Sequence, residues 1–317
     1  MITRSRIFMV LLLSIGRVWA VEPDLTAQQI LLNMSQAMAA LNYQGTVAFL
    51  KNDQLEPMRY SHAVHDGVQQ ERLMSLNSPL REIIRDSDQV SCLYKESQQN
   101  FVDHRPFERS FLLDMPANLV GAAEVYQFER MGEENVALHP SYVIDVLPKD
   151  QARYPRRIWV EKQQFLPLKA VLYDNNGMAI EQFVFTEFEI KENLPFVDLK
   201  AAELTRPTDP HVPQAVPPSS EQAAFVVTAM PNGFKELFFA RKPMHNTGQP
   251  VEHLLLGDGF TLVSIYMETT SPGMPSGLQS VGAVNSYSRT LANFQLTVMG
   301  EVPAETVKLI AEGIQLR

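Results

Sequence analysis

The stretch 155–190 constrains the fold of this chain more than any other part of the sequence. Its apolar and β-branched residues predict three consecutive strands, at 158–160, 166–173 and within 177–190. An Asn-Asn-Gly sequence separates the last two, and these residue types tolerate the positive φ angles of a hairpin turn. Strands with such short links pair antiparallel, so the stretch predicts an up-and-down sheet. Further strands of this sheet are predicted at 46–51, 58–65, 68–76, 90–94, 126–131 and 136–147.

The last strand of this stretch is apolar on both sides of its pleat. Alternation places Val184, Phe188 and Ile190 on one face. Phe183 and Phe185 then lie on the other face. A sheet with two apolar faces needs a protein cover on each face or a bound apolar ligand. The sequence therefore leaves open whether one face is a ligand-binding surface.

The composition favours two domains with hydrophobic cores and disfavours a nucleic-acid partner. The chain has 317 residues, of which 45% are hydrophobic and 20% are charged. Its net charge is -9, and the negatively charged phosphates of nucleic acids repel such a chain, so we expect no nucleic acid as a partner. The single cysteine, Cys92, excludes an intrachain disulfide, so the cores must supply the stability.

Residues 1–20 have the pattern of a secretory signal peptide. Arg4 and Arg6 form a positive start, 7–15 is apolar, and a Val-Trp-Ala sequence ends at a predicted cleavage site after Ala20. The apolar part is too short to span a bilayer, so a retained membrane anchor is the less favoured alternative. We therefore expect an exported protein.

One helix and one broken apolar segment are candidate covers for the sheet. The helix is predicted at 25–41, where Thr26 and Gln29 form a capping box and apolar residues recur at helical spacing. The segment 106–120 is rich in Phe and Leu but is interrupted by Pro116. Such a segment either fills the core beneath a curved sheet or moves aside for a ligand, and core filling is the commoner case.

A proline-rich linker divides the chain into two domains. Residues 206–220 contain five prolines, which favour an extended and semi-rigid conformation. The predicted domains are therefore 21–205 and 221–317. The second domain is predicted as an α+β module with a closing helix at 303–315 and a long loop at 269–288. Its strands are predicted at 225–228, 234–241, 251–256, 261–268 and 292–300.

The sequence contains no familiar catalytic or cofactor-binding motif. The Gly-rich nucleotide loops, the Gly-x-Ser-x-Gly elbow and His-Glu-x-x-His are all missing. His62 and His65 are spaced as His-x-x-His, but on a strand they point to opposite faces, so we expect exposed hairpin residues rather than metal ligands. We therefore expect no enzyme, no metal and no cofactor, and a hydrolase of envelope polymers is a weaker alternative.

Several short stretches together resemble a known family. They are YQGT at 43–46, YSH at 60–62 with Asp66-Gly67, ERL at 71–73, LNSPLREIIR at 76–85 and RIWVEKQQFLPLK at 157–169. The chain resembles the RseB/MucB family, exported regulators of the envelope-stress sigma factor in Gram-negative bacteria. The resemblance covers nearly all of the mature chain, and the block at 71–85 is its most specific part. Ser78 departs from it, since the family pattern has Gly there.

The resemblance implies an α+β protein with a definite role. The implied fold is an antiparallel half-barrel sheet that encloses helices, as in the carrier LolA, followed by the linker and a small α+β domain. The family implies a periplasmic protein that binds the periplasmic domain of a membrane anti-sigma factor and shields it from regulated proteolysis. Lipid-type stress signals, such as lipopolysaccharide, are expected to release it. A periplasmic lipid or lipoprotein carrier is the alternative, and self-association is left open.

Two sets of residues are candidates for binding. Apolar residues of the large domain are candidates for contacting lipid acyl chains, and plain core packing is the alternative for each. These residues are Phe111, Trp159, Phe183 and Phe185. Residues on two strands of the small domain are candidates for contacting the protein partner. The alternative is that these strand residues form the core of the domain. These residues are Phe234, Leu237, Phe239, Val263, Ile265 and Met267.

Overall fold

The described part of the chain folds into two β-sheet domains. The computed structural model describes residues 24–51, 53–86, 89–94, 99–104, 110–197, 222–243 and 250–317. Within these residues there are only three α-helices, so the protein is mostly β. The prediction of an α+β protein is therefore wrong. None of these helices is long and apolar enough to span a membrane. The predicted signal peptide, its cleavage at Ala20 and the linker at 206–220 lie outside the described residues.

The large domain contains one antiparallel sheet of eleven strands, in the order β6-β5-β4-β3-β2-β1-β11-β10-β9-β8-β7. The strands are β1 Asn42–Lys51, β2 Gln54–His65, β3 Val68–Ser75, β4 Arg81–Asp86, β5 Gln89–Tyr94, β6 Gln99–His104, β7 Tyr126–Val136, β8 His139–Pro148, β9 Arg156–Glu161, β10 Pro167–Tyr173 and β11 Ala179–Lys191. Consecutive strands pair, except that β6 and β7 form opposite edges and β1 pairs with β11. The predicted antiparallel sheet is therefore confirmed.

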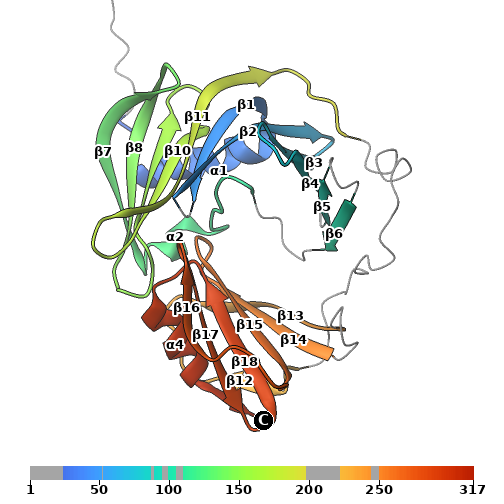
Figure 1. The fold of residues 1–317 in the computed structure, drawn as a ribbon. Helices are drawn as coiled ribbons and strands as arrows, with labels where there is room; N and C mark the ends of the chain where they lie inside the picture. The colour runs from blue at the N-terminus through green and yellow to red at the C-terminus, as the bar shows by residue number, and fades with distance from the viewer. Residues whose placement is uncertain are drawn as a thin grey trace, which may run out of the picture.

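This sheet is curved, and helix α1 (Ala27–Ala40) lies against its concave face (Figure 1). The helix begins as predicted, because the side chains and backbone amides of Thr26 and Gln29 form a reciprocal capping box. Ile30, Leu31 and Met34 are completely buried in the core between helix and sheet. Helix α1 is thus one fixed cover of the concave face.

A β-bulge changes which residues of β11 face the core. Thr46 pairs with Glu187 but Val47 pairs with Phe185, so Thr186 is an extra residue on β11. The bulge brings Phe188 to the same side as Phe185, with their ring centroids 5.5 Å apart. The expectation that Phe188 lies on the opposite face from Phe185 is therefore wrong. Strict alternation fails here because the bulge adds one residue to the strand.

The small domain contains a six-stranded antiparallel sheet in the order β13-β14-β15-β18-β17-β16, and a two-stranded pair of β12 and β19. Helix α4 (Ala304–Glu312) covers one face of the six-stranded sheet (Figure 1). The strands are β12 Phe225–Val227, β13 Lys235–Pro243, β14 Pro250–Gly257, β15 Leu262–Thr269, β16 Gly277–Val281, β17 Val284–Leu291, β18 Phe294–Gly300 and β19 Ile314–Leu316. The predicted closing helix is confirmed, and the other face of the sheet is free of it.

The expectation of a long loop at 269–288 is wrong, because this stretch contains β16 and the start of β17. Strand β16 is an edge strand, and most of its residues are exposed. It therefore lacks the alternation of apolar and polar residues that identifies a half-buried strand in a sequence. The Gly and Ser residues here suggested a loop, although pairing with β17 makes the segment a strand.

Candidate functional site

A turn of the small domain inserts into the core of the large domain. Phe260 is only 4% exposed and lies in the large hydrophobic core. Its ring centroid lies 5.1 Å from that of Tyr126 and 6.1 Å from that of Phe128. Gly259 precedes it with φ +101°, and a Cβ there would collide with Pro116. The turn therefore needs glycine both for its conformation and for this close approach.

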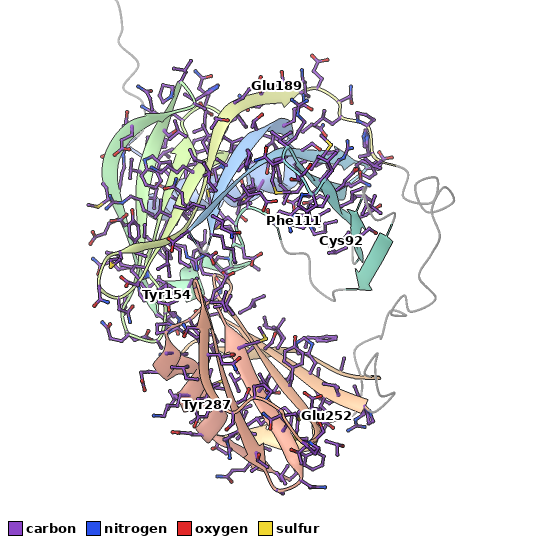
Figure 2. All side chains as sticks on the ribbon, viewed as in Figure 1. Cys92, Phe111, Tyr154, Glu189, Glu252 and Tyr287 are labelled. Atoms are coloured by element: carbon purple, nitrogen blue, oxygen red, sulfur yellow. The ribbon has the colours of Figure 1, made fainter. Side chains whose placement is uncertain are left out.

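A buried ion pair holds the same turn in place. Nε of Arg153 donates to Oδ2 of Asp258 at 2.5 Å, and both side chains are almost completely buried. The hydroxyl of Tyr126 donates to the same carboxylate at 2.8 Å. Burial lowers the pKa of Arg153, but the hydrogen bond and charge of Asp258 raise it more, so the guanidinium stays charged. Nearby, Nδ2 of Asn285 donates to the hydroxyl of Tyr154 at 3.0 Å, where the two domains meet (Figure 2).

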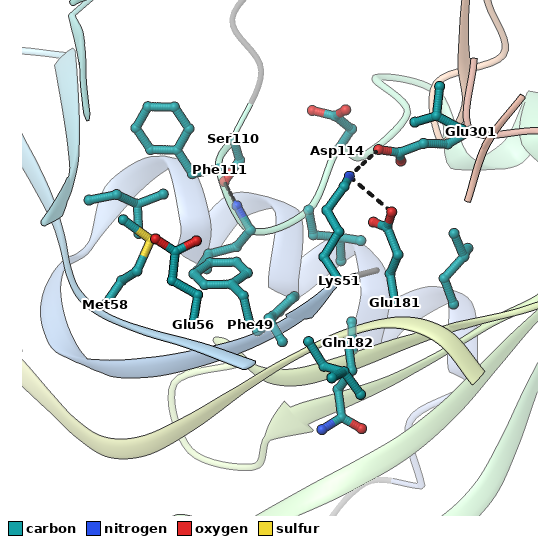
Figure 3. Close-up of a pocket in the computed structure, with 18 of the residues that line it drawn as sticks. Phe49, Lys51, Glu56, Met58, Ser110, Phe111, Asp114, Glu181, Gln182 and Glu301 are labelled. Carbon is teal, nitrogen blue, oxygen red and sulfur yellow. Dashed lines mark hydrogen bonds and ion pairs between the residues drawn. The ribbon is translucent and has the colours of Figure 1, made fainter. Parts of the chain in front are cut away.

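The two domains enclose a groove of about 1170 Å³ beside this contact. The large domain lines it with the ends of β1 and β2, with β10 and β11, and with residues 110–114. The small domain lines it with residues of β14, β15 and β18 and with the turn at 260–261. Figure 3 shows part of the lining, including Phe49, Phe111 and Lys51. We call this space the interdomain groove.

Apolar side chains from both domains line the interdomain groove. On the large domain they include Phe49 and Phe183, whose ring centroids are 6.4 Å apart. On the small domain they include Leu255, Leu262 and Tyr266, on the sheet face opposite α4. The groove is lined by both sheets, so it exists only when the two domains are in contact.

A charged cluster crosses the groove from one domain to the other. Nζ of Lys51 lies 2.9 Å from Oε1 of Glu181 and 3.5 Å from Oε1 of Glu301 (Figure 3). Burial raises the pKa of Glu181, and the negative charge of Glu301 raises it further. Burial lowers the pKa of Lys51, but its two carboxylate partners raise it more, so the ammonium stays charged.

The segment 110–118, which we call the inner segment, is attached to the large sheet by Glu71. This buried carboxylate accepts hydrogen bonds from Oγ of Ser110 at 2.7 Å and from the amide of Phe111 at 2.8 Å. It also accepts from the hydroxyl of Tyr60 at 2.8 Å and from Nε of Arg85 at 3.1 Å. A carboxylate with this many donors holds the start of the inner segment firmly.

The structure brings together only two of the four lipid candidates. Phe111 and Phe183 line the interdomain groove. Phe185 is 1% exposed and packs in the core against Tyr60, with ring centroids 5.9 Å apart. Trp159 lies on the convex face of the sheet, because it pairs with Lys169 whereas Phe183 is in register with the next residue of β10.

On that convex face, Trp159 has its own partners. Its Nε1 donates to Oε2 of Glu134 at 2.8 Å, and Nζ of Lys169 lies 4.0 Å from its ring centroid. The side chain is therefore covered by polar residues of neighbouring strands. Sequence spacing gives no signal for this separation, because Trp159 and Phe183 lie on different strands and the register between strands sets their faces.

The partner candidates on β15 point away from the groove. Val263, Ile265 and Met267 belong to the core under α4, whereas Leu262 and Tyr266, at intervening positions of the same strand, line the groove. The structure thus places these three candidates in the core and not on the groove surface, because apolar residues at alternate positions of a strand usually face the core.

The partner candidates near the start of β13 are divided. Phe234 is buried beneath Arg153, whose Cζ lies 4.6 Å from its ring centroid. Leu237 is 42% exposed, and Phe239 is partly buried against the core under α4. None of the three appears among the residues that line the groove.

The histidine pair does not form a metal site. Nδ1 of His62 lies 2.8 Å from the carbonyl oxygen of Leu41, and Nε2 of His65 lies 2.7 Å from that of Leu194. His62 is buried, so the expectation of an exposed hairpin residue is wrong for it. Across the described residues, no three His, Cys, Asp or Glu side chains are grouped to hold a metal ion.

The fold and the groove define a two-domain β protein whose shared site is suited to binding another molecule. Residues 26–206 match the MucB/RseB N-terminal domain, and residues 219–315 match the MucB/RseB C-terminal domain. The chain therefore belongs to the MucB/RseB family. Its relatives RseB and MucB are sigma-factor regulatory proteins.

Curated relatives and solved structures agree with this assignment. The sigma factor AlgU regulatory protein MucB of Pseudomonas aeruginosa is 28% identical over 316 residues, which are 96% of each chain. The sigma-E factor regulatory protein RseB of Escherichia coli K12 is 25% identical over 294 residues, which are 90% of this chain and 89% of that protein. A structure of the MucA/MucB complex of P. aeruginosa matches with TM-score 0.72 and 25% identity, over 92% of this chain and 99% of that one.

Proposed function

We propose that this chain is a periplasmic protein that binds the periplasmic region of a membrane anti-sigma factor in the interdomain groove. The observation that carries the proposal is that a groove of about 1170 Å³ is lined by apolar and charged residues from both domains. It is larger than a typical small-molecule pocket and suits an extended protein segment. The P. aeruginosa relative has been solved in complex with MucA, which supports a partner of this kind.

Binding in the groove would shield the partner from proteolysis. A protease must hold its substrate in an extended conformation within its own cleft, so a segment enclosed between two domains cannot be cut. The proposal includes export: residues 1–20 are removed after Ala20, 21–205 and 221–317 are the two domains, and 206–220 is the linker between them.

We further propose that a lipid-type signal, such as the acyl chains of lipopolysaccharide, releases the partner. Phe111 and Phe183 would contact the lipid, since both are apolar and line the groove. If lipid and partner favour different arrangements of the groove, each lowers the affinity of the other by the same factor. A coupling of about 1–3 kcal/mol would change the affinity about 5–150-fold.

The alternative function is a periplasmic lipid or lipoprotein carrier. The curved sheet around a helix is compatible with it (Figure 1). Against it stands the contact between the domains, because a carrier needs no second domain that is attached through Arg153 and Phe260. A carrier would purify with stoichiometric lipid and would not bind an anti-sigma factor.

The test measures binding between the exported chain and the periplasmic regions of two anti-sigma factors, that of its own organism and MucA of P. aeruginosa. We expect a complex at micromolar concentration, and Tyr266→Ala should weaken it because Tyr266 lines the groove. Leu278→Ala is the control, since Leu278 is exposed on β16 and does not line the groove. If the wild type binds neither region, the proposed function is wrong.

The same assay tests the lipid signal. Lipopolysaccharide should dissociate the complex, and Phe111→Ala should weaken this release more than it weakens binding of the partner. Release that is unchanged in Phe111→Ala would remove this residue from the lipid site.

A further inference from the structure

Arg156 is the cation of the interdomain groove that has no acidic partner among the described residues. The groove is also lined by Lys51, which is paired with Glu181 and Glu301. Arg81 lines it as well and is paired with Glu56 at 2.5 Å. These two cations are therefore already neutralised, whereas no described carboxylate neutralises Arg156.

The contacts of Arg156 leave most of its donors unused. Its Nη2 donates to Oγ1 of Thr261 at 3.4 Å, which is a long hydrogen bond. Its Cζ lies 5.3 Å from the ring centroid of Phe260. Its Nε is buried and has no hydrogen-bond partner in the described part of the chain. A guanidinium offers five donors in a planar fork, and leaving a buried one unpaired costs free energy.

The next residue shows what a satisfied arginine looks like on the same strand. Nε and Nη2 of Arg157 donate to the two carboxylate oxygens of Asp145, at 2.5 and 2.8 Å. Arg156 and Arg157 point to opposite faces of β9 because side chains alternate along a strand. The convex-face arginine thus has its carboxylate inside the protein, and the described residues supply none to the groove-face arginine.

We propose that Arg156 binds a carboxylate of the partner, from an Asp or Glu side chain in the segment that occupies the groove. The proposal rests on the proposed function and adds the chemistry that its site recognises. Phe260 supplies a flat apolar support for the guanidinium, which favours an oriented, two-pronged contact with a carboxylate. Leu262 is next to Thr261 and lines the groove, so the acidic residue should be followed or preceded by an apolar one.

The charge of the groove favours a single carboxylate over a phosphate group. Its lining contains three cationic residues, Lys51, Arg81 and Arg156, and four acidic ones, Glu56, Asp114, Glu181 and Glu301. A phosphate monoester carries nearly two negative charges and would meet only one unpaired cation among these acids. A carboxylate carries one charge, which Arg156 alone neutralises.

The experiment compares Arg156→Gln with Arg157→Gln in the full exported chain, using the anti-sigma regions named above as probes. We expect Arg156→Gln to raise the Kd roughly 10- to 100-fold, as expected for loss of a charge-assisted hydrogen bond. Arg157→Gln removes the same charge from the neighbouring position on the other face and should change the Kd less than about 5-fold. Arg156→Lys should bind with intermediate affinity, because it keeps the charge but loses the fork.

A double-mutant cycle separates recognition from a structural role. Each Asp or Glu of the bound region is changed to Asn or Gln, and one of these changes should weaken wild-type binding but have no further effect on Arg156→Gln. If each acidic substitution in the partner raises the Kd by the same factor with the wild type and with Arg156→Gln, the inference is wrong even though the partner binds. If Arg156→Gln does not fold, Arg156→Lys provides the same cycle.

Two other outcomes also decide the question. If the wild type binds neither anti-sigma region, the proposed function fails and this inference fails with it. If Arg156→Gln binds the partner normally but loses binding to vesicles of anionic phospholipid, Arg156 contacts lipid phosphates and the inference is overturned.

Discussion

At the residue scale, position in the sheet and not residue type decides what each aromatic side chain does. Phe183 and Phe185 are two residues apart on one face, yet Phe183 lines the groove and Phe185 is enclosed in the core. Trp159 lies on the opposite face and donates to Glu134. Phe111 packs against the large core, and the hydrogen bond from its amide to Glu71 helps to hold it there.

The ionisation of Glu181 should make stability depend on pH. Burial and the charge of Glu301 raise its pKa above the ordinary 4.5. The folded state therefore binds this proton more tightly than the unfolded state does, and the associated stability is present below pH 4.5 and is lost as pH rises through the raised pKa. Glu181→Gln cannot ionise, so the stability of the wild type relative to this variant should fall as pH rises.

Urea unfolding of both proteins across a pH series from 4.5 upward measures this difference. Glu312→Gln is the matched control, since Glu312 is exposed at the end of α4. A constant difference between wild type and Glu181→Gln over this range would show that the pKa of Glu181 is not raised.

At the element scale, the inner segment connects the concave face, the groove and the small domain. Leu112 and Leu113 are buried in the large core, while Phe111 lines the groove. Pro116 lies against Gly259 of the small domain. A molecule that displaced the inner segment would therefore disturb both the groove and the contact between the domains.

Glu71→Gln should release the inner segment. The substitution leaves the buried guanidinium of Arg85 without its carboxylate, and breaking a buried ion pair costs about 3–5 kcal/mol. We expect this loss in the free energy of unfolding, together with faster hydrogen exchange at the amide of Phe111. The control is Glu56→Gln, because Glu56 is paired with Arg81 at a more exposed position. Unchanged exchange at Phe111 would mean that core packing alone holds the segment.

At the scale of the whole molecule, the domains are attached by specific contacts and not only by the chain that links them. The turn at Phe260 is enclosed by the large domain, and Arg153 binds Asp258 from the other side of the boundary. At the start of α4, Oγ1 of Thr306 donates to the carbonyl oxygen of Ala152 at 2.9 Å. The groove therefore has a defined shape before any partner binds.

Asp258→Asn should loosen this arrangement. It removes the charge that balances a completely buried Arg153, at a cost of about 3–5 kcal/mol. We expect a lower free energy of unfolding and a larger radius of gyration in small-angle X-ray scattering. Asp150→Asn is the control, because Asp150 binds the same guanidinium but is 37% exposed. Equal effects of the two substitutions would show that Asp258 has no special role between the domains.

The local features of this fold could be predicted from the sequence. The capping box at Thr26, the alternating strands and the closing helix depend on residues a few positions apart, so their signals are visible in one stretch of chain. Edge strand β16 was missed because its exposed residues have no alternation. The motif blocks also carried the family, since they preserve residue types at defined positions.

The sequence by itself thus determined most of the elements, the two domains that the family models match and the family. The tertiary structure decided the site. The bulge at Thr186 is set by pairing with β1, and Arg153 meets Asp258 across 105 positions of the chain. Strand register and contacts of this kind depend on how distant parts of the chain pack, so a local sequence pattern cannot predict them. For the same reason, only the structure shows that Arg157 is paired with Asp145 while Arg156 faces the groove with no ion-pair partner among the described residues.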